Sequence, residues 1–456
     1  MPDHITNGEE LATTSARELA LDCIEAGIDA AHPRQVIRST VSFDGGRLRI
    51  EGETITLDDF EDVLLVGGGK ATGAVSTEIA AILGDRLTGG AIVTDEPVSI
   101  PGIENFVGGH PVPNEEGVRG AKRVLELVER ADETTLVLAV ITGGGSALMT
   151  VPAPGIELTD VQKVTDAMLE AGMEIQDVNA VRKHISAIKG GGLASAAVPA
   201  TVRTLVFSDV VGNDLSVIAS GPTVPDDSTY RDAQSALERH DIEVPEAVQS
   251  RLESGVVGNI SETPDESHPA FERVWMHILA DGMTALAAAR DVAAEAGYDP
   301  LILSARLRGE ARESATFHCG IAEECHATGR PVEPPAVLLS GGELTVTVSG
   351  DGAGGPSTEF ALASALELDN SHTTVAAVDT DGIDGHANAA GGIVDAATVT
   401  DAERARNALD TNDAATYLHT ENSCILTGPT GTNVNDLRVV VLEDEDTASR
   451  ESPTTL

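Results

Sequence analysis

Residues 63–70 read VLLVGGGK, an apolar run of strand length that passes directly into three glycines and a lysine. Similar strand-like runs occupy residues 48–50, 90–94, 136–141 and 204–207. Helical stretches such as 117–130 and 159–171 separate them. Apolar strands that alternate with helices are typical of a parallel sheet covered on both faces. The sequence therefore predicts an α/β fold with a Rossmann-like parallel sheet in its N-terminal part.

Further alternation indicates a second lobe, because 456 residues exceed what one core usually organises. Before the first strand, Ser15 is a plausible N-cap for a helix reaching about Ala31. Residues 222–269, rich in Asp, Glu, Ser and Pro, predict a lid or an excursion between domains. The later elements are predicted as strand 274–279, helix 284–296, strand 301–303, helix 310–327, strand 336–340, a turn at Gly341 and Gly342, strand 343–348 and strand 437–442.

The charge balance limits the partners. The chain carries 74 acidic residues, 24 arginines and only five lysines, for a formal net charge of −45. Such a surface repels nucleic-acid phosphates, so we expect no nucleic-acid partner. It suits a salt-rich cytoplasm in which ions screen the self-repulsion. The N-terminus has no apolar signal segment and no run is long enough to span a membrane, so we expect a cytoplasmic protein without a membrane partner.

Cysteines predict neither a disulfide framework nor a metal centre. Cys23, Cys319, Cys325 and Cys424 are too few and too scattered for a network of disulfides. A metal site around Cys319 and Cys325 is the sharpest alternative, but zinc sites favour closer ligands than seven residues apart. We interpret that segment as a structural helix.

Two glycine-rich turns that follow strands predict an anion site. Gly69 and Lys70 combine exposed N–H groups with a cation before a helix. The spacing fits neither a Walker A loop nor a dinucleotide fingerprint, and a tight structural turn stays possible. After the strand at 136–141, the run TGGGS places Gly144 and Ser146 where backbone could approach a substrate, or where a helix packs on the sheet.

Three of the few remaining basic residues cluster in residues 179–192, NAVRKHISAIKGGG. We interpret this segment as one helix on which Arg182 and Lys189, seven apart, share a face while Lys183 points elsewhere. Three cations in eight residues of an acidic chain predict binding of phosphate or carboxylate; internal salt bridges are the alternative.

Carboxylates follow two of the predicted strands. Asp209, after the strand at 204–207, lies where open α/β sheets bind ligands and could hold Mg²⁺ or accept a hydroxyl proton; Asp214 is the fallback. The run VDTDGIDG at 378–385 clusters three more carboxylates but lacks the terminal Glu of an EF-hand. It predicts a Mg²⁺-side or ribose-side loop, or an acidic turn. The run TGPTGTNVND at 427–436 offers hydroxyls and amides for a polar ligand.

Taken in order, the motifs GGGKA, GGGSAL, RKHIS with KGG, SDVVG with SGPT, SGGE, DGIDG and TGPTGTNVND resemble the glycerate 2-kinase family over residues 15–443. The resemblance implies a two-lobed protein in which a Rossmann-like glycerate kinase domain (10–265) and a connection (266–335) precede a smaller α/β MOFRL domain (336–445). It also implies ATP-dependent phosphorylation of D-glycerate at the 2-hydroxyl, giving 2-phosphoglycerate, with Mg²⁺ and an active site between the lobes. A monomer or homodimer is expected.

The family correspondence and the residue chemistry together assign roles. Lys70, Lys189, Arg182 and Asp209 are the predicted catalytic residues, and Gly69, Gly144, Ser146 and Lys183 the predicted substrate-binding residues. The predicted nucleotide-side residues are Gly341, Gly342, Glu343, Asp379, Thr427, Gly428, Thr430 and Asn433, and the predicted metal ligands are Asp209, Asp381 and Asp384.

One motif departs from the family. Relatives read GGRNQE where this chain has GGPSTE at 354–359, so Pro356 replaces an arginine implicated in the site. Arg182 or Lys189 could supply the missing charge, or the activity could differ. The competing hypotheses are a hydroxypyruvate reductase, which the faulty dinucleotide fingerprint disfavours, and a non-catalytic protein that binds sugar acids or nucleotides.

Overall fold

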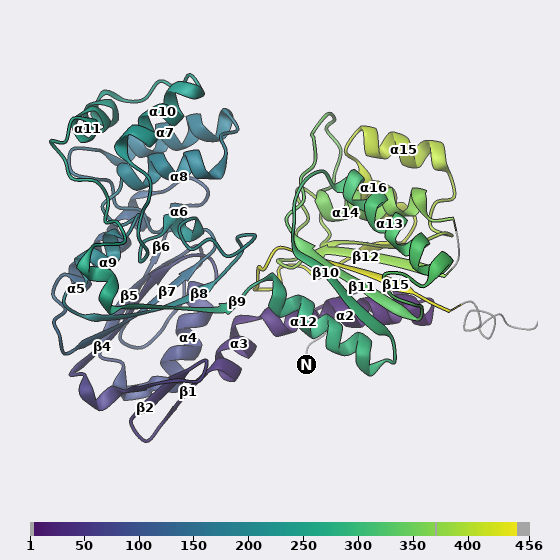
Figure 1. The fold of residues 1–456 in the computed structure, drawn as a ribbon, viewed down its shortest axis with the longest axis horizontal. Helices are drawn as coiled ribbons and strands as arrows, with labels where there is room; N and C mark the ends of the chain where they lie inside the picture. The colour runs from purple at the N-terminus through teal and green to yellow at the C-terminus, as the bar shows by residue number, and fades with distance from the viewer. Residues whose placement is uncertain (1–3, 370–371, 445–456) are drawn as a thin grey trace, which may run out of the picture. The chain divides into compact units, whose positions relative to one another are not determined.

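The computed structural model describes residues 4–369 and 372–444, which form two compact units. The central unit is Val36–Leu279, and the terminal unit joins Met1–Gln35 to Ala280–Leu456. Each unit is built around its own six-stranded sheet (Figure 1). Both expectations, an α/β fold and a second α/β lobe, are confirmed.

The sheet of the central unit has the strand order β6-β5-β4-β7-β8-β9. The strands from β6 to β8 run parallel to one another. All eight residues of β7 are buried, as expected for a strand covered on both faces. In chain order the strands are β4 (Asp62–Gly68), β5 (Gly89–Thr94), β6 (Ile103–Val107), β7 (Thr135–Thr142), β8 (Thr201–Phe207) and β9 (Val274–Ala280).

Helices cover this sheet on both faces because the chain reverses direction across it. It moves outward from β4 to β6 and then returns past β4 to β7, so right-handed crossovers put α4 (Thr72–Leu83) and α5 (Glu115–Val128) on opposite faces. Helix α9 (Gly192–Ala196) packs on the same face as α5. The point of reversal lies between β4 and β7, where open α/β sheets form a crevice at the carboxyl ends of the strands.

Four helices form a second core within the central unit. They are α7 (Leu158–Glu170), α8 (Ile175–His184), α10 (Tyr230–Arg239) and α11 (Glu246–Val256). The predicted excursion at 222–269 therefore contains two packed helices. The prediction of one helix through 179–192 is wrong: α8 ends at His184, and the chain turns back so that Ser186 bridges to Pro152.

The sheet of the terminal unit is mixed, with the order β10-β11-β15-β12-β13-β14. Only β10 and β11 pair in parallel; the other neighbours are antiparallel. The strands are β10 (Asp299–Leu307), β11 (Ala336–Gly342), β12 (Thr373–Asp379), β13 (Gly391–Asp395), β14 (Cys424–Ile425) and β15 (Asp436–Leu442). Helices α2 (Ser15–Ala31) and α12 (Gly282–Glu295) cover one face, and α13 (Ala311–Thr328) and α14 (Pro356–Glu367) the other (Figure 1).

The predicted domain boundaries differ from these units. The N-terminal helix α2, capped by Thr14 rather than by Ser15, packs on α12 and on β15 of the terminal unit. Its Gly27 approaches so closely that an added Cβ would lie 2.5 Å from Leu437 Cδ2. Residues 280–335 also belong here, because β10 pairs with β11. Residues 343–348 form only an isolated bridge at Thr345, so the strand predicted there is absent.

The remaining elements are short or connect the sheets. They are α1 (Gly8–Leu11), α3 (Pro33–Thr40), α6 (Gly145–Leu148), α15 (Ala402–Asp410), α16 (Ala414–Thr420), the antiparallel meander β1 (Val41–Asp44), β2 (Arg47–Ile50) and β3 (Glu53–Thr56), and the 3-10 turns η1 (Leu57–Asp59), η2 (Gly84–Arg86), η3 (Ile218–Ser220) and η4 (Pro269–Arg273). Among residues 4–369 and 372–444, no helix is both long enough and apolar enough to cross a membrane.

Candidate active site

Lys70 lies at the point of reversal in the central sheet. It follows β4 and donates its backbone N–H to the carbonyl of Gly143, 2.9 Å away, at the end of β7. Its side chain crosses Gly144: a Cβ built on that glycine would lie 3.1 Å from Lys70 Cγ. Gly69 has a φ of +140°, and an added Cβ there would lie 2.2 Å from the Thr142 hydroxyl. The two glycine runs therefore let β4 and β7 end close together and place the exposed lysine beside the second run.

Asp209 faces the same crevice from the end of β8. A Cβ on Gly143 would lie 1.9 Å from Asp209 Oδ2, so only glycine leaves room for this carboxylate. Burial raises the pKa of Asp209, while hydrogen bonding to its own backbone and the charge of Lys70 lower it in part. The carboxylate is thus more basic than a solvated aspartate and has a cation close by. The alternative, Asp214, only closes a turn by accepting hydrogen bonds from the Ser216 N–H and hydroxyl.

His110 is a residue of this crevice that sequence reasoning missed. Its ring lies on Gly144 opposite Lys70, with Cδ2 3.3 Å from the position of an added Cβ. Burial and the charge of Lys70 lower its pKa, Asp95 opposes them in part, and Arg182 adds a smaller lowering effect. The sequence does carry a signal for this residue. His110 follows β6, a parallel strand whose carboxyl end lies at the same edge of the sheet as those of β4 and β7.

Arg182 and Lys189 line one small pocket together with Ser146, Thr150 and Ser186. The Lys189 ammonium donates to the carbonyl of Met149 at 3.1 Å. Burial and then the charge of Arg182 lower the pKa of Lys189 to about 7, and burial also lowers the pKa of Arg182. No carboxylate of the described residues lies within ion-pair distance of either. A buried ammonium beside a partly buried guanidinium, without a counter-charge, is what an anion site requires.

Lys183 does not join this pocket. Its ammonium pairs with Asp226 Oδ1 at 2.9 Å, and both side chains are buried. Lys183 and hydrogen bonds from Ser228 lower the pKa of Asp226 and outweigh the effect of its burial. The structure therefore gives Lys183 the internal salt bridge that was the alternative for this cluster, because the helix turns it away from the Arg182 face.

In the terminal unit, three carboxylates converge at one edge of the sheet. Asp379 ends β12 and lies directly across from Asp436, which begins β15 and lies across from Gly342 at the end of β11. Asp381 follows, and its N–H donates to Asp379 Oδ1 at 3.0 Å. Burial, with the charges of Asp381 and Asp436, raises the pKa of Asp379 to about 8. A cation bound here would relieve both the burial and the repulsion.

Asp384 has a different role from the predicted metal ligand. Its Oδ1 accepts the N–H of Ser357 at 2.9 Å and its Oδ2 accepts the N–H of Thr358 at 2.7 Å. The buried carboxylate thus satisfies the first turn of α14, although burial still raises its pKa to about 6. With one backbone donor on each oxygen, it stabilises the helix that begins at Pro356.

The two polar loops of the terminal unit pack against each other. Gly382 approaches the carbonyl of Gly428 and the hydroxyl of Thr427, and Thr430 donates its N–H to Asp381 and its hydroxyl to Thr380. Asn433 accepts the N–H of Asn435. Thr430 is therefore an internal brace, whereas Thr427 and Gly428 retain exposed surface. Gly341 and Gly342 end β11 and are buried, and the exposed Glu343 follows them.

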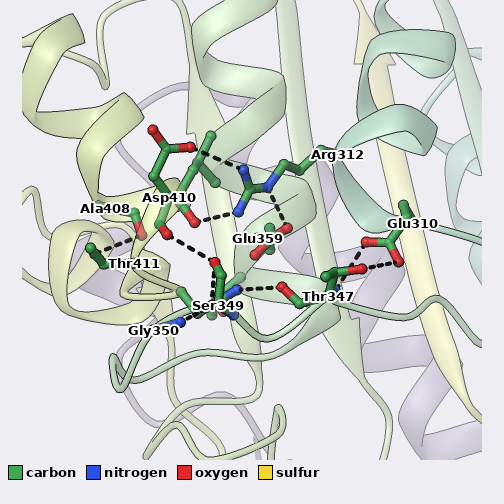
Figure 2. Close-up of polar contacts among 12 residues, drawn as sticks. Glu310, Arg312, Thr347, Ser349, Gly350, Glu359, Ala408, Asp410 and Thr411 are labelled. Carbon is green, nitrogen blue, oxygen red and sulfur yellow. Dashed lines mark hydrogen bonds and ion pairs between the residues drawn. The ribbon is translucent and has the colours of Figure 1, made fainter.

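The altered GGPSTE motif is held by an arginine from another helix (Figure 2). Arg312 Nε donates to Glu359 Oε1 at 2.6 Å, and Nη1 and Nη2 reach Asp410 and the carbonyl of Leu409. Each guanidinium nitrogen thus has a protein acceptor. Arg312 braces the motif from α13, with one bond from each of its three nitrogens to acceptors in α14 and α15.

Comparisons with known proteins agree over nearly the whole chain. Residues 19–253 match a domain of unknown function, DUF4147, and residues 336–436 match the MOFRL family. A D-glycerate 2-kinase of Thermotoga maritima is 36% identical over 431 residues, 93% of this chain and 97% of the relative. A glycerate 2-kinase of Pyrococcus horikoshii is also 36% identical, over 93% of this chain and 97% of its own.

A solved structure and a relative that is not named as a kinase give further comparisons. A Thermotoga maritima glycerate kinase structure, 35% identical, superposes with a TM-score of 0.82 over 93% of this chain and 99% of that one. A putative hydroxypyruvate reductase of Agrobacterium vitis is 40% identical over 83% of this chain and 87% of its own. The shared domains, the coverage and the common fold show that this chain belongs to the glycerate 2-kinase family.

Proposed function

We propose that the chain transfers the γ-phosphoryl group of ATP to the 2-hydroxyl of D-glycerate, giving 2-phosphoglycerate and ADP. One observation carries this proposal: Lys70, Arg182 and Lys189 gather around the crevice of the central unit, and among the described residues none of them has a carboxylate within ion-pair distance, in a chain with 74 acidic residues. Phosphoryl transfer needs this arrangement, because its catalysis consists mainly of positioning and of neutralising spread negative charge.

The proposed roles follow from the surroundings of each group. Arg182 and Lys189 bind the carboxylate of glycerate, and Ser146 orients it within their pocket. Lys70, which is exposed above Gly144, stabilises the phosphoryl group during transfer. Asp209 accepts the hydroxyl proton as the substrate oxygen forms its bond to the γ-phosphorus and the bond to the ADP oxygen breaks. Its raised pKa makes it a better base than a solvated aspartate.

Mg²⁺ fits best beside Asp379 and Asp381. Among residues 4–369 and 372–444, no group of three or more His, Cys, Asp or Glu side chains could hold a metal ion. Magnesium, however, commonly binds through one or two carboxylates plus substrate phosphates. Burial and the charges of Asp381 and Asp436 raise the pKa of Asp379, although the buried Arg438 pairs with Asp436 nearby, so a further cation would still be favoured at Asp379 and Asp381. When bound, the ion supplies charge neutralisation at the phosphate oxygens. Asp384 is excluded from this set because it caps α14.

The nucleotide is proposed to bind the terminal unit at Gly341, Gly342, Glu343, Thr427 and Gly428. Gly341 and Gly342 end β11, Glu343 follows it, and Thr427 and Gly428 lie in the loop after β14; β11 ends at the same sheet edge as Asp379. Thr430 and Asn433 act as braces for this surface, since their side chains bond to Thr380 and Asn435.

A hydroxypyruvate reductase is the second candidate, because two relatives carry that name. The glycines at the end of β4 argue against a nicotinamide site. A Cβ on Gly67 would lie 2.0 Å from the carbonyl of Val140, so this glycine serves close packing of β4 on β7 rather than approach to a pyrophosphate. A reductase would consume NADH with hydroxypyruvate, which absorbance measures directly.

One assay tests the proposal. D-glycerate, ATP and Mg²⁺ are supplied in multimolar KCl, and the product is coupled through enolase without a mutase. An immediate signal means that the 2-phosphate formed. A signal that needs added mutase would refute the choice of hydroxyl, and absence of ADP release would favour a binding protein.

A further inference from the structure

Behind the pocket of Arg182 and Lys189 lies a chain of three polar side chains. The hydroxyls of Ser146 and Ser220 are 2.9 Å apart, and Ser220 Oγ donates to Asn179 Oδ1 at 2.8 Å. Ser220 is fully buried and Asn179 is 3% exposed, while Ser146 lines the pocket. The chain therefore runs from the pocket surface into the protein interior.

The direction of these hydrogen bonds follows from counting protons. A hydroxyl has one proton to donate, and an amide oxygen can only accept. Because Ser220 gives its proton to Asn179 Oδ1, the bond between the two serines is donated by Ser146, while Asn179 Nδ2 is buried without a partner. Ser146 consequently has no proton left for a ligand. It presents lone pairs to the pocket.

Two other pocket hydroxyls, those of Thr150 and Ser186, also donate to protein carbonyls. Thr150 donates to the carbonyl of Ser146 at 2.9 Å. Ser186 donates to the carbonyl of Val151 and accepts the N–H groups of Ile188 and Lys189, so it is saturated. The charged donors at the pocket are then Arg182 and Lys189, and the hydroxyls left with lone pairs to offer are those of Ser146 and the more deeply buried Thr150.

The backbone at Ser220 is built to hold this chain in place. Ala219, Ser220 and Gly221 all have left-handed φ values, +49°, +61° and +63°. A left-handed φ costs a residue other than glycine about 1 to 2 kcal/mol. The turn therefore persists because the packing around it holds the backbone in this conformation. The same turn accepts the N–H of Gly190 at Ser220 and the N–H of Gly191 at Gly221. One strained turn thus fixes both the serine chain and the loop after Lys189.

We propose that Asn179 and Ser220 are positioning residues that hold the Ser146 hydroxyl as an acceptor, so that the pocket selects an acid carrying a hydroxyl group over the corresponding deoxy acid. The inference rests on the proposed function, in which Arg182 and Lys189 bind the carboxylate. A ligand that brings both a carboxylate and a hydroxyl donor satisfies the cations and the serine together. A deoxy acid leaves the lone pairs of Ser146 buried without a donor.

The test compares how three acids compete for the site: D-glycerate, D-lactate, which lacks the 3-hydroxyl, and 3-hydroxypropionate, which lacks the 2-hydroxyl. Dissociation constants are measured by calorimetry, independently of turnover. The wild-type protein should bind one deoxy acid about tenfold or more weakly than glycerate, the value of one hydrogen bond. In Ser146→Ala the ratio of the dissociation constant of the deoxy acid to that of glycerate should fall to about threefold or less. Ser267→Ala, which removes an exposed hydroxyl of the same unit, should leave the ratio unchanged.

Three further variants, at Ser220 and Asn179, test the direction of the chain. Ser220→Gly suits the left-handed backbone and should lower the ratio, but it should have no further effect in a Ser146→Ala background. Asn179→Asp keeps an acceptor for Ser220 and should retain the ratio, whereas Asn179→Leu should lose it. Any effect of the added charge falls on all three acids alike.

Two results would overturn the inference: an unchanged ratio in Ser146→Ala, or equal loss in Asn179→Asp and Asn179→Leu. If the wild-type protein instead binds glycerate with discrimination but forms no 2-phosphate in the enolase assay, the proposed function fails while the inference about selectivity stands.

Discussion

Replacing Lys189 with methionine should stabilise the protein and abolish its affinity for glycerate. The lysine is buried, and burial together with Arg182 lowers its pKa from 10.5 to about 7. A shift of that size means that the charged side chain destabilises the folded state by about 5 kcal/mol at low pH. Methionine has no charge to bury, so this destabilisation disappears. It also loses the hydrogen bond to Met149, and that loss reduces the gain in stability by about 1 to 3 kcal/mol. We expect a net gain in unfolding free energy of about 2 kcal/mol at pH 6.

The pH dependence has a definite sign. Because the folded pKa of Lys189 is lowered, the unfolded chain binds more protons between pH 7 and 10.5. The contribution of this group to stability is therefore fully present above pH 10.5 and is lost as the pH falls towards 7. The carboxylate of glycerate requires the charged lysine, so its Kd should be constant below pH 7 and rise by up to about tenfold per unit above it. Lys189→Arg should flatten that rise, because arginine stays charged.

Chemical denaturation at pH 6 and 9, with calorimetric binding of glycerate from pH 6 to 9, measures both effects in one high-salt buffer. Lys163→Met, a lysine outside this pocket, is the matched control and should change neither quantity appreciably. The reasoning is refuted if Lys189→Met is less stable than the wild type at pH 6 and binds glycerate normally, or if the wild-type affinity does not vary with pH.

The other predictions concern the two sheet edges and the surface. Lys70→Ala should lower kcat by about 10²- to 10³-fold in the enolase-coupled assay while leaving the unfolding midpoint in place; near-normal turnover would remove Lys70 from the mechanism. Asp209→Asn should lower kcat by about 10²- to 10⁴-fold with little change in the Kd of glycerate, and a change confined to Kd would contradict its role as base. Asp384→Ala should cost about 2 kcal/mol or more of stability in denaturant titrations because α14 loses the acceptor for two buried N–H groups; a loss of Mg²⁺ affinity without destabilisation would restore the metal role. Raising KCl from 0.2 to about 3 M should raise the thermal midpoint, since salt screens the net charge of −45, and a falling midpoint would argue against adaptation to salt.

Hydrophobic pattern and turn chemistry predicted much of the fold. The apolar runs at 63–66 and 136–141 became β4 and β7, and the glycines after each strand mark where the backbone approaches its neighbour closely. These features are local: a buried parallel strand needs a continuous apolar run, and a close backbone approach needs a glycine. The family motifs are also short local segments, so their order along the chain was sufficient to identify the family.

Long-range packing decided what the sequence left open. Nothing in residues 10–35 indicated that α2 would pack on β15 rather than in the N-terminal domain, because an amphipathic helix does not specify its partner. The sequence predicted that Arg182 and Lys189 share a face of one helix. In the structure they meet for a different reason, because the chain turns back after His184. Lys183 and Asp384 had the right chemistry for a site, and tertiary structure gave each a structural partner instead.

The sequence by itself determined which groups are available: the strands, the glycine turns, the scarce cations and the carboxylates after the strands. Only the tertiary structure decided which of them lack an internal partner. Lys189 and Lys183 are six residues apart and chemically identical, but Asp226 neutralises one and leaves the other with an arginine as its charged neighbour. The charge state of a buried group depends on everything packed around it, and those neighbours come from distant parts of the chain.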